Sequence, residues 1–402
     1  MQNNALVRKS LDIVRPVEIS RFGRIEHFMF MLTIFLYPIS LVSHVLYLIP
    51  LLFLLFLSIT NLRKSMSITD FAAMTFGFAA AIIPFLVEFS AVTPSHELTS
   101  KLIVNVIAIC IMAGNERFVF THKTLRHLSY ICIAWIAIVM LIYVKSGITS
   151  VSAVWAQLNQ NSEVNSSSLY GIAEPLRDVF LTKNISAMFV VSVFSLYLYV
   201  ARNLGKKVSV FAFMIFFIAA LVFLSRQAIL GMIVIYGFYR FIIAGHLNKI
   251  VIIAMLGIAA TVFFTHFFDL NNSNDGASQR LLLWKYFFSH YQDFFLLGNG
   301  VVKLNGILNS TYGIDNFHMF FMNQIGAYGF IHFILFSLFL IMIYIRKGPQ
   351  KGRILLVAGY LLNVCFQTYG YEYGNLFLFL AIFAPVLNAD ISKPKIPKFK
   401  FR

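Results

Sequence analysis

Two arginines stand beside long apolar runs, where a guanidinium group is well suited to bind phosphate. Arg226 follows the apolar run that starts at Val208, and Arg280 opens the amphipathic segment QRLLLWKYFFSHYQDFF. The guanidinium fork matches phosphate oxygens and stays charged, and a helix N-terminus at Arg280 would also favour an anion. The alternatives are a snorkelling side chain at Arg226 and an arginine that contacts lipid headgroups at Arg280.

A polar group precedes another apolar run, in the segment GIDNFHMFFMNQIGAYGF. It contains Asp315, Asn316 and His318, whose carboxylate, amide and imidazole can order a hydroxyl group or take its proton. A lone histidine at a membrane surface more often has no chemical role. Asp315 and His318 are candidate catalytic residues, and Asn316 is a candidate substrate ligand.

Four further residues are weaker candidates for substrate binding. Gly298 and Gly300 in LLGNG allow a tight turn near a phosphate, although helix capping and turning explain them equally well. Arg177 and Lys183 belong to a mixed-charge cluster, and most such clusters are only solvated loop.

The elements that must position these residues are membrane-spanning helices. The chain has 402 residues, of which 59% are hydrophobic and 12% charged, with a mean hydropathy of +0.80, which excludes an ordinary soluble domain. Backbone groups in lipid must pair internally, and the apolar runs are too long and unbroken for barrel strands. We expect an all-α polytopic bundle of about 12 transmembrane helices in one membrane domain over residues 1–402. The apolar stretches fall near residues 28–43, 45–60, 68–90, 101–114, 127–144, 184–201, 208–225, 227–244, 249–268, 317–345, 354–370 and 374–389.

The basic residues predict the orientation of this bundle. With both termini in the cytoplasm, three quarters of the 32 lysines and arginines fall in cytoplasmic segments, as the positive-inside rule requires. The net charge of +16 therefore needs no nucleic acid to explain it. Two long external loops result, at residues 145–183 and 266–318, and the second holds an interfacial helix at Gln279–Phe295.

Neither the cysteines nor the N-terminal segment predicts a cofactor or a signal peptide. Cys110, Cys132 and Cys365 lie inside apolar segments without metal-ligand spacing, so we expect neither a disulfide framework nor a metal site, and no cofactor. The apolar stretch behind the basic N-terminus lacks a cleavage site, so we expect no removed signal peptide.

Two motifs resemble the O-antigen ligase and polymerase superfamily, membrane glycosyltransferases of the GT-C type. LSRQAILG, from Leu224 to Gly231, is similar to a Ser-Arg-small segment of that family. The run from Arg280 through Trp284 to Gly298 and Gly300 is similar to an Arg, Trp, Gly-x-Gly run. The resemblance covers roughly residues 184–390.

The third family motif separates the polymerases from the ligases. Ligases have a His-Asn pair whose histidine lies eleven residues before the first glycine of Gly-x-x-Gly. Here Gly326 lies eleven after Asp315, so Asp315 stands in the place of the catalytic histidine, Asn316 matches the asparagine, and Gly329 is the second glycine. In the alternative register, with His318 as the equivalent, the asparagine is lost. The first register favours a Wzy-type polymerase.

The resemblance implies a reaction, a location and partners. A polymerase of this family joins lipid-linked glycan repeat units of O-antigen, capsule or exopolysaccharide on the outer face of the bacterial inner membrane. The substrate would be an undecaprenyl-pyrophosphate-linked oligosaccharide within membrane lipid, and a chain-length regulator and a flippase would be partners. Arg226 and Arg280 would hold the pyrophosphate, and Asp315 with His318 would orient or deprotonate the acceptor.

Two other functions stay open. A ligase of the same family would move the finished glycan to lipid A core. A flippase or ion-coupled transporter would need charged residues near the bilayer midplane, and the sequence offers mainly Asp70 and Glu88 for that role.

Overall fold

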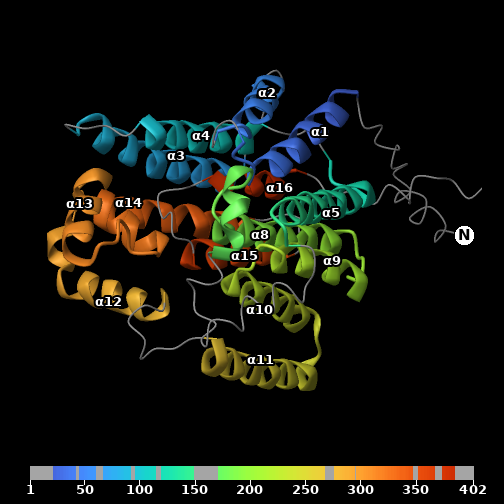
Figure 1. Ribbon diagram of the computed structural model, residues 1–402. Helices are drawn as coiled ribbons and strands as arrows, with labels where there is room; N and C mark the ends of the chain where they lie inside the picture. The colour runs from blue at the N-terminus through green and yellow to red at the C-terminus, as the bar shows by residue number, and fades with distance from the viewer. Residues whose placement is uncertain are drawn as a thin grey trace, which may run out of the picture.

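The computed structural model (Figure 1) describes most of the chain between residues 21 and 384. The predicted positions of both termini and much of the loop at 145–183 lie outside the described residues, as does part of the loop at 266–318. The described ranges are 21–41, 45–59, 67–91, 96–114, 119–148, 171–267, 276–294, 296–346, 352–366 and 374–384.

Regular structure in these ranges is helical, apart from an isolated bridge between Ile39 and Phe180, which confirms the all-α prediction. The α-helices are α1 (Arg21–Leu36), α2 (Leu48–Ile59), α3 (Ile68–Phe89), α4 (His96–Gly114), α5 (His122–Lys145), α8 (Lys183–Asn203), α9 (Val210–Leu221), α10 (Arg226–Ile243), α11 (His246–Phe267), α12 (Gly276–Ser289), α13 (Val301–Tyr312), α14 (Phe320–Ile345), α15 (Arg353–Phe366) and α16 (Leu380–Phe383). The 3-10 helices are η2 (Glu174–Asp178), η3 (Tyr291–Phe294) and η4 (Gly374–Phe379).

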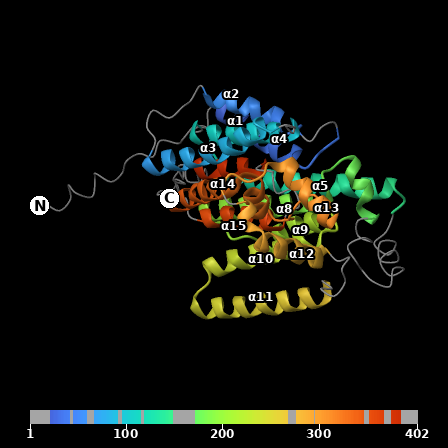
Figure 2. The same cartoon turned by 90° about the vertical axis from the view of Figure 1, so that its left-hand side faces the viewer.

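Five of the described helices are long and apolar enough to cross a membrane: α3, α5, α8, α10 and α14. Shorter apolar helices include α2 and α9, at 12 residues each. Large apolar side chains stay exposed on the periphery, as at Leu247 and Ile250 of α11, the helix at the edge of the bundle in Figure 2. Such a surface suits lipid rather than water, so the helices are those of a membrane-embedded protein.

Helix α8 forms the centre of the bundle. It is buried along its whole length and packs against α5, α9, α10 and α15. Small residues allow these close approaches: a Cβ at Gly231 of α10 would lie 3.3 Å from the Val191 methyls, and one at Gly359 of α15 would collide with Ser195. A helix surrounded on all sides by other helices is expected to be apolar all round, as this one largely is.

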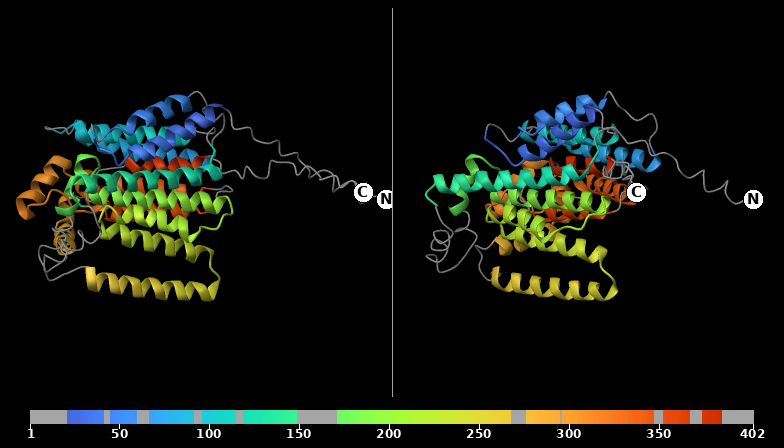
Figure 3. Two further views of the ribbon diagram at one scale, coloured as in Figure 1. Left: turned by 45° about the vertical axis from the view of Figure 1, so that its right-hand side comes forward. Right: turned by 90° about the vertical axis from the view of Figure 1, so that its right-hand side faces the viewer.

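Hydrogen bonds and ion pairs define the two ends of the bundle. Tyr199 near the end of α8 donates to the Ala381 carbonyl, and Arg346 after α14 donates to the Ile382 carbonyl. Helices α8 and α14 therefore end together, at what we term the Arg346 end. Their starts lie at the opposite end, which we term the Lys183 end, where α12 and α13 also gather (Figure 3).

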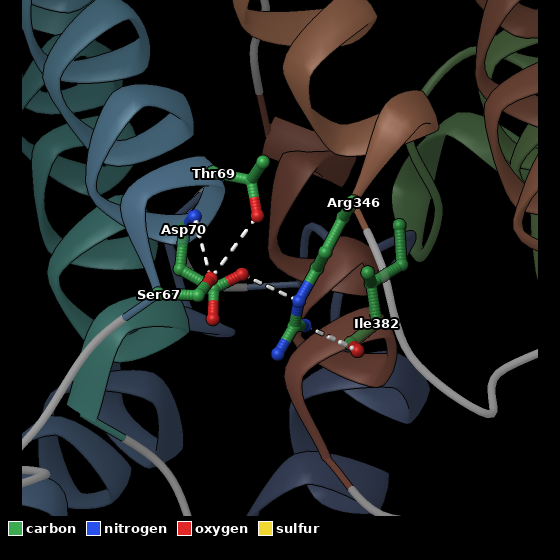
Figure 4. A network of polar contacts seen from close by, with 5 residues as sticks. All are labelled: Ser67, Thr69, Asp70, Arg346 and Ile382. Atoms are coloured by element: carbon green, nitrogen blue, oxygen red, sulfur yellow. Dashed lines mark hydrogen bonds and ion pairs between the residues drawn. The ribbon is translucent and has the colours of Figure 1, made fainter.

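Helices α3 and α14 pack antiparallel along their length. At the Arg346 end, Asp70 of α3 forms an ion pair with Arg346 (Figure 4). The Arg346 guanidinium also lies over the Phe383 ring. At the Lys183 end, Glu88 of α3 accepts a hydrogen bond from the Val301 amide that starts α13. The two acidic residues considered for a transporter thus have structural contacts, one at each end of α3.

The apolar run at 28–59 divides into two helices. The chain turns between α1 and α2, where the Ser40 amide donates to the Val179 carbonyl and Leu181 donates to Pro38. Trp135 of α5 donates to the Phe35 carbonyl at the end of α1. These contacts hold the turn at the Lys183 end.

Candidate functional site

Arg226 and Lys183 lie together at the starts of two helices. Ser225 donates from its hydroxyl to the Asn184 side-chain oxygen at 2.8 Å, which joins the start of α10 to the start of α8. The Lys183 side chain is almost completely buried, and its positive charge interacts with that of Arg226. The structure therefore pairs a predicted catalytic arginine with a predicted substrate-binding lysine. We term these two residues the cation pair.

Local geometry explains why the segment LSRQAILG takes this form. Leu224 has a φ of 55°, an uncommon conformation for a residue with a branched side chain, and it turns the chain directly into α10. Ser225 then bonds to α8, and Gly231 lets the two helices approach closely. Arg226 lies between these two anchors and is held at the helix start, where the backbone amides favour an anion.

A second group of candidate residues consists of Arg280, Asp315 and His318, and we term it the Asp315 group. Burial, and then the nearby positive charge of Arg280, lower the pKa of His318 from 6.5 to about 4, whereas the charge of Asp315 acts in the opposite direction. His318 is therefore neutral at pH 7 and a weak base. Of the two candidate bases, the exposed Asp315 carboxylate is the one that carries negative charge to attract a proton.

Two asparagines fix the loop that carries this group. Asn316 donates to the Asp315 carboxylate at 2.6 Å and accepts from the His318 amide at 2.7 Å. Asn323, on the first turn of α14, accepts from the Phe317 amide at 2.7 Å. His318 is held at a φ of 53°, which costs about 1 kcal/mol or more for a residue with a Cβ. The buried Asn316 thus positions the Asp315 carboxylate. Its predicted role as a substrate ligand stays a prediction.

Among the buried polar atoms in this region that have no hydrogen-bond partner in the described part of the chain, two are ring nitrogens. They are Nδ1 of His318 and Nε1 of Trp284. Trp284 lies four residues after Arg280 on α12 and so faces the same side of that helix. Buried donors and acceptors are normally satisfied, so both atoms are available to a bound ligand. A helix occupies much of the predicted segment, as α12 at Gly276–Ser289 with η3 after it, and it begins four residues before Arg280. Its place at the membrane interface stays a prediction.

Gly298 and Gly300 contact the backbone of α14. Helix α14 is interrupted at Gly329, whose φ is 81° and ψ 177°, and the chain around LLGNG crosses this break. The amides of Asn299 and Gly300 donate to the carbonyls of Gly326 and Ala327, at 3.0 and 2.8 Å. A Cβ on Gly298 would lie 2.3 Å from the Ala327 carbonyl carbon, and one on Gly329 would overlap Leu296. The glycines of LLGNG and of the Gly-x-x-Gly motif in α14 therefore allow these two backbone segments to pack in direct contact.

No described contact joins Arg177 to the cation pair or to the Asp315 group. It is in η2, more than half exposed, and forms an ion pair with Glu174 three residues earlier at 3.1 Å. Exposed pairs of this kind contribute little. Its predicted role in substrate binding stays a prediction.

Three residues that hold the candidate site in place were missed by the sequence analysis: Asn184, Ser225 and Asn323. Ser225 and Asn184 bond to each other beside Arg226 and Lys183, and Asn323 bonds to the amide of Phe317 beside His318. The signal was present in part, because a buried amide within an apolar run, such as Asn323 in MFFMNQIG, is costly unless it is bonded.

The chain matches no known protein family, no curated protein and no solved structure. The functional argument therefore depends on the geometry of the cation pair and of the Asp315 group.

Proposed function

We propose that the protein polymerises lipid-linked glycan repeat units by glycosyl transfer from polyprenyl pyrophosphate. The observation that carries the proposal is the cation pair, a buried lysine beside an arginine at two helix starts. Like charges in low dielectric repel, and an anion with several charges bound between them stabilises both. Pyrophosphate at a membrane surface is such an anion.

The proposed arrangement assigns a step to each group. The acceptor hydroxyl oxygen attacks the anomeric carbon of the donor sugar, and the bond from that carbon to the pyrophosphate oxygen breaks. Asp315 takes the hydroxyl proton, and Asn316 holds the carboxylate for it. Arg226, Lys183 and Arg280 stabilise the negative charge that develops on the leaving pyrophosphate, which is usually the largest catalytic term.

The same proposal sets the membrane context. The chain would cross the bacterial inner membrane about 12 times in a GT-C-like arrangement, with both termini cytoplasmic and the Lys183 end outside. Substrate would enter from the bilayer, beside α12, whose exposed Leu281 and Leu282 suit the membrane interface.

The test is elongation by the purified protein. Lipid-linked repeat units are supplied in liposomes, and product length is read on a gel. We expect a ladder with the wild type, no ladder with Arg226→Ala or Asp315→Asn, and a full ladder with Lys303→Ala, which removes an exposed basic residue of α13 at the same end. Wild-type ladders from both of the first two variants would overturn the proposal.

A cell assay separates the two rival functions. Deletion of a polymerase gene leaves lipopolysaccharide core with a single repeat, whereas deletion of a ligase or a flippase leaves bare core. The transporter hypothesis gains no support from Asp70 or Glu88, because each holds a structural contact at a helix end.

A further inference from the structure

A groove of about 560 Å³ lies between α1 and α5, at the Arg346 end of the bundle. Both helices begin there: His27 of α1 contacts Thr124 of α5 at 3.0 Å, whereas Tyr143 near the end of α5 donates to Val222 at the Lys183 end. The groove is therefore far from the cation pair and independent of the proposed function.

One end of the groove is cationic. The charge comes from Arg24 in the first turn of α1 and from Lys123 in the first turn of α5. His27 and His127 face each other across it, with ring centroids 5.4 Å apart. No Asp or Glu is among the described residues that line the groove. Both helix N-termini point to this end, which adds partial positive charge.

The rest of the groove is apolar. Met31 and Phe35 of α1 and Ile131 of α5 line it, together with the exposed Phe28 and Tyr130. From Arg24 to Phe35 is eleven residues, or roughly 16 Å at 1.5 Å per residue. One leaflet of the hydrocarbon core is about 15 Å deep. The groove therefore has the depth of a single acyl chain under a charged headgroup.

We propose that this groove binds an anionic glycerophospholipid, with its phosphate between Arg24 and Lys123 and one acyl chain along Met31 and Phe35. Charge selects the headgroup, because a zwitterionic lipid brings its own cation to a site that already has two. The apolar depth selects a lipid over a free phosphate ion, which would leave the deeper part of the groove unfilled.

The test measures lipid retention by the purified, delipidated full chain in neutral detergent. Native mass spectrometry compares phosphatidylglycerol with phosphatidylcholine of identical acyl chains. We expect selective retention of phosphatidylglycerol and a loss of about fivefold for each cation removed, so about 25-fold for Arg24→Gln/Lys123→Gln. Both side chains are exposed, so the substitutions leave the packing intact. Lys206→Gln/Lys207→Gln removes the same charge from the same end and should retain the lipid.

Two further arms locate the ligand and its source. A photoactivatable phosphatidylglycerol should label peptides of α1 and α5, and labelling should fall in Arg24→Gln/Lys123→Gln but not in the control. Inorganic phosphate at millimolar concentration should fail to displace the lipid. Equal retention of both lipids, equal losses in the two double variants, or displacement by phosphate alone would each overturn the proposal.

Discussion

Two pairs of charged residues at opposite ends of the bundle illustrate two uses of charge in this protein. At one end Arg346 meets Asp70, a carbonyl and an aromatic ring, all within a few residues of helix ends. At the other, Lys183 lies beside Arg226. The first pair joins opposite charges, whereas the second brings two positive charges close together.

The difference indicates where a ligand is needed. A buried ion pair is self-sufficient, and removal of one partner leaves an uncompensated charge. Two like charges repel each other less when an anion is bound between them. Replacing one of these residues should therefore weaken anion binding more than it lowers folding stability. Loss of the first pair should therefore lower stability, and loss of the second should lower activity.

The largest effect is expected from Arg346→Ala. It leaves Asp70 buried without its counter-charge and should destabilise the fold by about 3–5 kcal/mol. Thermal unfolding in detergent, followed by size-exclusion chromatography, measures this. The matched control is the double variant Arg346→Met/Asp70→Asn, which should recover most of the loss. Equal loss in the single and double variants would show that the ion pair itself is not the cause.

Next in size is the effect of Arg226→Ala on elongation. A lost charge-stabilising contact costs about 10²–10³ in rate, so the product ladder should disappear while the unfolding temperature stays close to wild type. Added pyrophosphate sharpens the contrast, because a ligand at 100 times its Kd stabilises by about 2.7 kcal/mol. It should raise the unfolding temperature of the wild type and not that of the variant. A fall in stability as large as that of Arg346→Ala would remove the distinction between the pairs.

Much of the fold follows from the sequence, because apolar length and helical periodicity are local properties. The presence of a helix at α12 and the start of α14 near the Asp315 group were both predictable in this way. The interruption of α14 at Gly329 was not. It depends on Leu296 and Gly298 lying against that backbone, a contact between segments that no local pattern specifies.

The candidate site was predictable in its residue types but not in its partnerships. Arg226 and Lys183 were chosen separately, and only the hydrogen bond from Ser225 to Asn184 brings them together. Arg346 as the partner of Asp70 likewise depends on the antiparallel packing of two distant helices. Charge and spacing along a chain indicate chemistry, whereas the identity of a partner is decided by tertiary packing.

A smaller effect is expected from a change in the charge state of His318 in the Asp315 group. Its pKa of about 4 in the folded protein lies below its ordinary 6.5, so the unfolded chain binds more protons between these values. The stability that this neutral histidine contributes is present above pH 6.5 and is lost as the pH falls toward 4. Pyrophosphate bound at Arg280 should offset the repulsion and raise the pKa of His318. Histidine NMR titration, assigned with His318→Gln, measures the shift, and an unchanged pKa would place the anion elsewhere.

The smallest effect is expected from Arg177→Ala. Arg177 was predicted to bind substrate, yet its side chain is exposed and paired with Glu174, and exposed pairs contribute about 0.2–1 kcal/mol. Elongation should stay within about twofold of wild type, and stability within about 0.5 kcal/mol. Arg226→Ala is the natural comparison, because both changes remove one arginine from the same end of the bundle. A large loss with Arg177→Ala would mean that net positive charge, rather than the buried position of the cation pair, attracts the substrate.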